Sequence, residues 1–159
     1  MTTSTPISIL AAGSLGDCVL TLPALQFLQS RAKVKVFGTL PFQSLGSGLL
    51  GVEEVLPLDP LLTALYHPDA PPAVFPGDAV NEVFIFFKEK DDKLSQSLPK
   101  AFPGKIHWPS KSFEEFLKEE RWAGSYWLDL AGWVPQPGAA PPTARLRISE
   151  MARNQGKII

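Results

Sequence analysis

One carboxylate, Asp17, stands directly after a glycine-containing turn that runs from Gly13 to Gly16. The turn follows an apolar run at 7–12, and the residues after it repeat their apolar side chains at helical spacing. The pattern predicts a strand, a turn and then a helix that begins at Asp17. A helix start offers unpaired N–H groups and a positive dipole end, so it favours a polar ligand. A carboxylate aimed into such a place is a candidate general base.

Two other interpretations of this turn compete with the general base. A dinucleotide fingerprint needs a central glycine between Gly13 and Gly16, and a P-loop needs a Gly-Lys-Ser/Thr ending; the turn has neither. A nucleotide-binding protein would nevertheless predict ADP or NAD binding by the isolated chain. The structural interpretation is that Asp17 only caps its helix and favours the helix dipole.

The elements that must position Asp17 follow from alternating apolar runs and helical patterns. Runs that are apolar on both faces are typical of buried parallel strands, and the segments between them have helical spacing. We expect strands at 7–12, 34–37, 52–58, 83–87 and 105–108, and helices at 17–31, 41–50, 61–67, 92–98, 112–120 and 122–133. Repeated strand–helix units predict an α/β fold, a Rossmann-like open parallel sheet with helices on both faces.

Composition narrows the class of protein. The 159 residues suit one domain, the net charge is −1, and there is no long basic stripe, so nucleic acid is not an expected partner. The single cysteine, Cys18, excludes an internal disulfide and agrees with a reducing compartment. No signal peptide or membrane span is visible, so we expect a cytoplasmic protein. No His, Cys or carboxylate cluster has the spacing of metal ligands, and we expect no metal held by this chain.

A proline-rich segment at 135–142 divides the chain. Its composition is typical of a linker, so we place a Rossmann-like domain at 1–134 and a linker with a crossover helix at 135–159. A strand-like run at 145–148, a helix at 149–155 and the start of another apolar run follow the prolines. We therefore expect the chain to lead into a further domain that this sequence lacks.

The segment at 13–25 resembles the N-terminal signature of glycosyltransferase family 9, the lipopolysaccharide heptosyltransferases and their relatives. The likeness continues at 37–42, at 51–59 and in the late stretch 148–157. The resemblance implies the N-terminal, acceptor-side half of a two-domain enzyme with the GT-B arrangement. The missing C-terminal domain would hold the nucleotide-sugar donor, typically ADP-heptose, behind a His-Pro-Gly motif, which this chain does not contain.

The resemblance to glycosyltransferase family 9 also implies which residues form the catalytic and acceptor sites. Asp17 matches the proposed catalytic base of an inverting transfer, and the turn that matches the acceptor pocket consists of Gly13, Ser14, Leu15 and Gly16. The acceptor implied is a lipopolysaccharide-type glycolipid or oligosaccharide, with peripheral association at the inner face of the cytoplasmic membrane through that acceptor. The donor half being absent, this fragment alone is expected to be inactive. The alternative is a non-catalytic module that binds a glycan or a partner protein.

One departure from the family concerns positive charge. The family often has Lys or Arg at the end of the first strand, where this chain has Ala11. Lys88 and Lys90 follow the apolar run at 83–87, which puts them at the sheet edge where open α/β sheets bind ligands. We hypothesise that they supply the charge for an anionic acceptor. The alternative is a solvated loop in which the acidic residues within 89–92 balance them.

Overall fold

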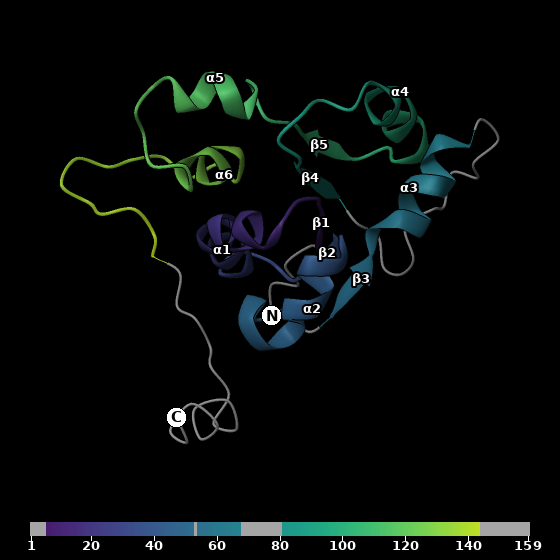
Figure 1. Cartoon of the computed structure of the whole chain (residues 1–159), viewed down its shortest axis with the longest axis horizontal. Coiled ribbons are helices and arrows are strands. Elements are labelled where there is room, and N and C mark those ends of the chain that lie inside the picture. Colours follow the sequence, from purple (N-terminus) through teal and green to yellow (C-terminus); the bar gives the residue numbers. More distant parts are fainter. Residues whose placement is uncertain (1–5, 53, 68–80, 144–159) are drawn as a thin grey trace.

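The computed structural model describes residues 6–52, 54–67 and 81–143, and they form one five-stranded parallel sheet with helices around it (Figure 1). The strand order is β3-β2-β1-β4-β5. The strands are β1 (Ile7–Ala11), β2 (Val34–Gly38), β3 (Val55–Pro57), β4 (Glu82–Phe86) and β5 (Lys105–His107). The helices are α1 (Leu15–Gln29), α2 (Leu40–Leu50), α3 (Leu58–Tyr66), α4 (Asp92–Ala101), α5 (Phe113–Leu117) and α6 (Ser125–Leu130).

The two central strands are apolar on both faces because the sheet is covered on both faces. All five residues of β1 are buried, and β4 is buried from Val83 onward. Ile9 lies in register with Val36 of β2 on one side and with Phe84 of β4 on the other. A parallel strand in this position has no solvent face, which explains its continuous apolar run.

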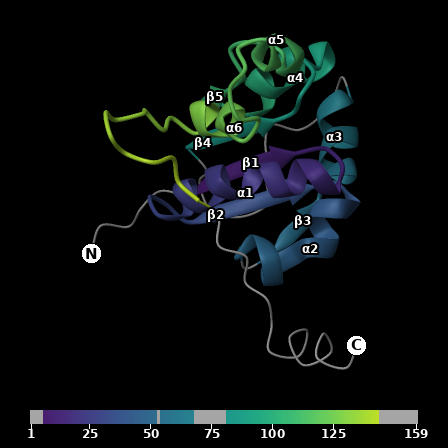
Figure 2. The same cartoon turned by 60° about the vertical axis from the view of Figure 1, so that its left-hand side comes forward.

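Two hydrophobic cores, one on each face, hold the helices to the sheet. The core under α1, α2, α5 and α6 includes Leu22, Leu25, Phe42, Phe116 and Trp127. The core under α3 and α4 includes Leu61, Leu65, Leu94 and Leu98. Figure 2 shows α3 and α4 on the side of the sheet opposite α1. The predicted fold, a Rossmann-like open parallel sheet with helices on both faces, is confirmed.

Several elements are shorter than the sequence pattern predicts; the helix expected at 112–120, for example, is α5 at Phe113–Leu117. The strand expected at 52–58 is reduced to β3, because Pro57 ends its pairing at the sheet edge and Leu58 already begins α3. The helix expected at 122–133 is reduced to α6. It ends before Gly132, whose φ of +82° is a backbone conformation that glycine adopts readily and that stops a helix.

The proline-rich segment expected to be a linker is exposed from residue 135 to 141 and contains no helix or strand. The strand and helix expected at 145–148 and 149–155 lie outside the described residues. The domain boundary after residue 134 therefore stays a prediction.

Trp127 joins α6 to the sheet and offers a test of this core. Its side chain is 0% exposed and its ring stacks on Phe86 of β4 with 5.3 Å between ring centroids. We expect Trp127→Ala to lower the free energy of unfolding by about 3–5 kcal/mol, because it removes the largest side chain of that core.

Trp122 is the matched control, since 49% of it is exposed. We expect Trp122→Ala to cost less than about 1 kcal/mol. Urea denaturation followed by circular dichroism measures both variants. Equal losses for the two tryptophans would mean that α6 does not pack on β4 as described.

Candidate functional site

The candidate site lies where β1 and β4 end side by side at the carboxyl edge of the sheet. The last residues of the two strands, Ala11 and Phe86, are in register, and the Ala12 N–H donates to the Phe86 carbonyl at 3.3 Å. In the order β3-β2-β1-β4-β5 the connections after β1 and β4 run toward opposite ends of the sheet. Ligands of open α/β sheets bind in the crevice that this topological switch leaves.

An open cavity of about 540 Å³ occupies this crevice. Its lining comes from both loops: Ala12 and Gly13 after β1, and residues 87–93 after β4. The structure thus brings the glycine turn and the two predicted lysines to one place, as the carboxyl-edge argument predicted. Ala11, the last residue of β1, is fully buried in the core.

The Asp17 carboxylate folds back over the turn that precedes α1. The helix begins at Leu15, two residues earlier than predicted, with Ser14 as its N-cap, so Asp17 occupies the third helical position. Asp17 Oδ2 accepts a hydrogen bond from the Ser14 backbone N–H at 2.7 Å and another from Ser14 Oγ at 2.9 Å. This is the reach-back contact of a capping box, in which the side chain satisfies an orphan donor of the helix start.

Gly13 makes room for that carboxylate. Its φ is +153°, and a Cβ built on it would lie 2.5 Å from Asp17 Oδ2 and 2.6 Å from Asp17 Cβ. The Gly13 carbonyl also accepts a hydrogen bond from Thr39 Oγ1 at 3.1 Å, which ties the turn to the start of α2. No larger residue fits this position without displacing Asp17.

Lys88 closes the other side of Asp17. Its Nζ forms an ion pair with Asp17 Oδ1 and lies 4.8 Å from the ring centroid of Phe113. Lys90 does not join this pair: its Nζ lies 3.5 Å from Asp92 Oδ1, and both of those side chains are exposed. The structure therefore assigns the two predicted lysines to different surroundings, one at the carboxylate and one at the rim.

The contacts of the Asp17 carboxylate lower its pKa. Burial raises the pKa of Asp17, yet the hydrogen bonds from Lys88 and Ser14 together with the Lys88 charge outweigh it, and the pKa falls below 3.8. Burial, helped by the Asp17 charge, raises the pKa of the Cys18 thiol to about 11. Cys18 is therefore a neutral buried thiol at neutral pH and not a nucleophile.

The other members of the predicted acceptor turn lie on the surface of the first helical turn. Ser14, Leu15 and Gly16 are exposed, with Leu15 at 59%. None of the three is among the residues that line the cavities described here. Their role toward an acceptor stays a prediction.

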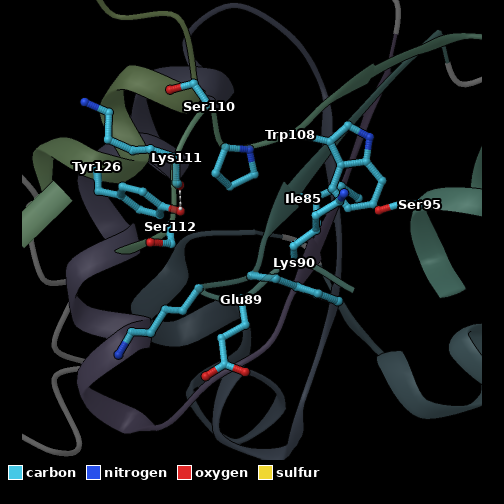
Figure 3. Close-up of a pocket in the computed structure, with 12 residues that line it drawn as sticks. Ile85, Glu89, Lys90, Ser95, Trp108, Ser110, Lys111, Ser112 and Tyr126 are labelled. Atoms are coloured by element: carbon cyan, nitrogen blue, oxygen red, sulfur yellow. Dashed lines mark hydrogen bonds between the residues drawn. The ribbon is translucent and has the colours of Figure 1, made fainter. Parts of the chain in front are cut away.

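A second cavity of about 490 Å³ adjoins the first, between the loops after β4 and β5 (Figure 3). Its walls are mainly apolar, with Ile85, Phe87, Trp108, Pro109 and Tyr126, and Ser95 and Ser112 are among its polar residues. Lys88 and Lys90 line both cavities, so the two cavities share a wall. The sequence analysis did not predict this apolar cavity wall. Trp108 nevertheless follows β5 at the carboxyl edge of the sheet, where open α/β sheets bind their ligands.

Among the described residues, no group of three His, Cys, Asp or Glu side chains is arranged to hold a metal ion. None of their helices is long and apolar enough to cross a membrane.

Comparison with known proteins gives a likeness of fold. No family model and no curated protein matches the chain. Escherichia coli heptosyltransferase WaaC solved with ADP-2-deoxy-2-fluoro heptose superposes with a TM-score of 0.54 and 16% identity, over 89% of this chain and 51% of that one. The same protein with ADP gives a TM-score of 0.54 and 17% identity, over 95% and 52%. The chain thus spans about half the length of the solved structures it matches.

Gly13 and Gly16 form a matched pair that tests the packing of the Asp17 carboxylate. We expect Gly13→Ala to lower the free energy of unfolding by about 1–3 kcal/mol, because it adds both backbone strain and the clash with Asp17. A Cβ on Gly16 meets only Ser14 Oγ at 3.8 Å, so Gly16→Ala should be neutral or stabilise the helix by up to about 1 kcal/mol. Chemical denaturation measures both, and an equal effect of the two alanines would contradict the geometry.

Proposed function

We propose that this chain is the acceptor-side half of an inverting glycosyltransferase of family 9, with Asp17 as its general base. The observation that carries the proposal is the ion pair between the Asp17 carboxylate and Lys88, which lines the cavity where β1 and β4 separate; Asp17 itself is not among the residues that line this cavity. The likeness of fold to a heptosyltransferase, and the signature at 13–25, support the same family.

The chemistry needs one carboxylate from this half. The acceptor hydroxyl oxygen bonds to the anomeric carbon on the face opposite the nucleotide, and the bond from that carbon to the diphosphate oxygen breaks. The electron pair of that bond leaves with the nucleotide diphosphate, and the hydroxyl proton passes to Asp17. A diphosphate leaves without help from a general acid, so no second carboxylate is required.

The donor in this proposal is a nucleotide sugar of the ADP-heptose type, held by a C-terminal domain outside this sequence. The solved structures that resemble the chain carry ADP or an ADP-fluoroheptose, and the chain spans about half of their length. The acceptor is a lipopolysaccharide-type glycolipid or oligosaccharide at the inner face of the cytoplasmic membrane. Lys88 and Lys90 line the crevice and supply positive charge for an anionic group of that acceptor.

A non-catalytic glycan- or partner-binding module is the second candidate, and one observation favours it. The Asp17 side chain is only 8% exposed, and its oxygens already contact Ser14 and Lys88, as a purely structural cap would. In such a module the crevice binds its ligand without transferring a sugar to it. The two candidates differ in whether Asp17 is needed for turnover.

Asp17→Asn separates the two in the protein that contains both halves. Asparagine keeps an oxygen for the Ser14 contacts but cannot take a proton, so we expect kcat to fall by about 10²–10⁴-fold, the usual contribution of a general base. Sugar transfer from donor to acceptor is the assay. Asp59→Asn, an exposed carboxylate at the start of α3, is the control and should keep the wild-type rate. Unchanged transfer by Asp17→Asn would rule out the base and favour the binding module.

A further inference from the structure

The carboxylate that would act as a base is largely covered by protein groups, and its side chain is 8% exposed. Ser14 donates twice to Asp17 Oδ2, and the Lys88 ammonium sits on Oδ1. A general base must offer a free lone pair within hydrogen-bond reach of the hydroxyl it deprotonates. These three contacts leave one lone pair of the carboxylate, on Oδ1, the oxygen that the Lys88 ammonium already contacts. An acceptor hydroxyl therefore has to reach Oδ1 beside Lys88, and it gains access when the ammonium moves aside.

The Ser14 contacts are the ones that stay. They join residues three positions apart within one helical turn, and the absent side chain of Gly13 leaves the carboxylate its place there. With both bonds made, Oδ2 remains fixed whatever happens at Oδ1. The carboxylate keeps its orientation without help from Lys88.

Lys88 is the contact that can move. It comes from a different loop, its side chain is 38% exposed, and its ammonium sits on a flexible four-carbon stem. It lines both cavities, so a ligand in either one meets it. The ring of Phe113, with its centroid 4.8 Å from Nζ, also attracts the ammonium, so Asp17 is not the only group that holds it.

We propose that Lys88 is a displaceable counter-ion, which covers Asp17 Oδ1 and turns to an anionic group of the acceptor when that group enters the crevice. The exchange replaces one ion pair by another and exposes Oδ1 to the acceptor hydroxyl. That the acceptor hydroxyl gives its proton to Asp17 rests on the proposed function. That Lys88 exchanges Asp17 for an anionic group of a ligand does not.

The electrostatic consequence favours catalysis. With Lys88 in place, the pKa of Asp17 is lowered and the carboxylate is a weak base. When Lys88 leaves, its hydrogen bond and its charge no longer lower the pKa of Asp17, so that pKa rises and the base strengthens at the moment the acceptor is present. The neutral Cys18 thiol on α1 does not oppose this change, and the remaining charges of the crevice are those of residues 89–93 on the loop after β4 and the start of α4.

The test is the titration of Asp17 followed through its carboxyl carbon by NMR in the isolated chain. The signal is assigned by its loss in Asp17→Asn. We expect Lys88→Met to move the titration midpoint of Asp17 upward, Lys88→Arg to keep it near that of the wild type, and Lys90→Met to leave it in place. Lys90 is the matched control because it is a lysine of the same loop that pairs elsewhere.

Sulfate, which stays anionic across the acid range, serves as the displacing anion. In the wild-type chain we expect sulfate to raise the midpoint of Asp17 in a saturable way, relative to sodium chloride at equal ionic strength, and to lose this effect in Lys88→Met. An unchanged midpoint in Lys88→Met, or no difference between sulfate and chloride, would overturn the proposal. The titration needs no sugar donor, so it tests the counter-ion separately from the proposed function. If Lys88→Met raised the titration midpoint of Asp17 while Asp17→Asn kept full transfer activity in the protein with both halves, the catalytic role of Asp17 would be rejected and the counter-ion role of Lys88 would stand.

Discussion

The ion pair between Lys88 and Asp17 joins the loop after β4 to the first turn of α1, which follows the loop after β1. These two loops form the crevice at the edge of the sheet. Each loop begins at the end of a central strand, and the parallel register of β1 and β4 fixes how far apart the loops start. The pair becomes possible only because the sheet places β4 next to β1 and not next to β3, its predecessor in sequence. The two apolar cores, one on each face of the sheet, fix the ends of β1 and β4 from which these loops start.

The same carboxylate has to meet a structural and a chemical demand that oppose each other. A helix start is stabilised by an ionised, well-bonded side chain, and both Ser14 and Lys88 keep Asp17 in that state. A general base works best with a pKa nearer to the working pH. A counter-ion that moves away when the acceptor binds resolves the conflict. Lys88 stabilises the ionised carboxylate before the acceptor binds, and its departure makes Asp17 a stronger base once the acceptor is bound.

Much of this architecture follows from the sequence, and the limits of that inference have physical reasons. The continuous apolar runs around Ile9 and Phe84 predict buried strands because nothing but burial on both faces requires them. The position of Asp17 after the turn follows from strand–helix alternation. Contact between Asp17 and Lys88 was not predictable, since side-chain pairing between loops depends on strand order, which periodicity does not encode. The apolar wall at Trp108 could have been predicted, because Trp108 follows a strand at the same carboxyl edge of the sheet.

The central claim is that Asp17 takes the acceptor proton after Lys88 has left it, and the pH dependence of sugar transfer by the protein with both halves tests this most directly. The acid limb of kcat/KM reports the base in the free enzyme, and the acid limb of kcat reports it in the bound complex. The account predicts that the kcat limb lies at higher pH than the kcat/KM limb, because the carboxylate loses its counter-ion on acceptor binding. Coincident limbs would contradict it.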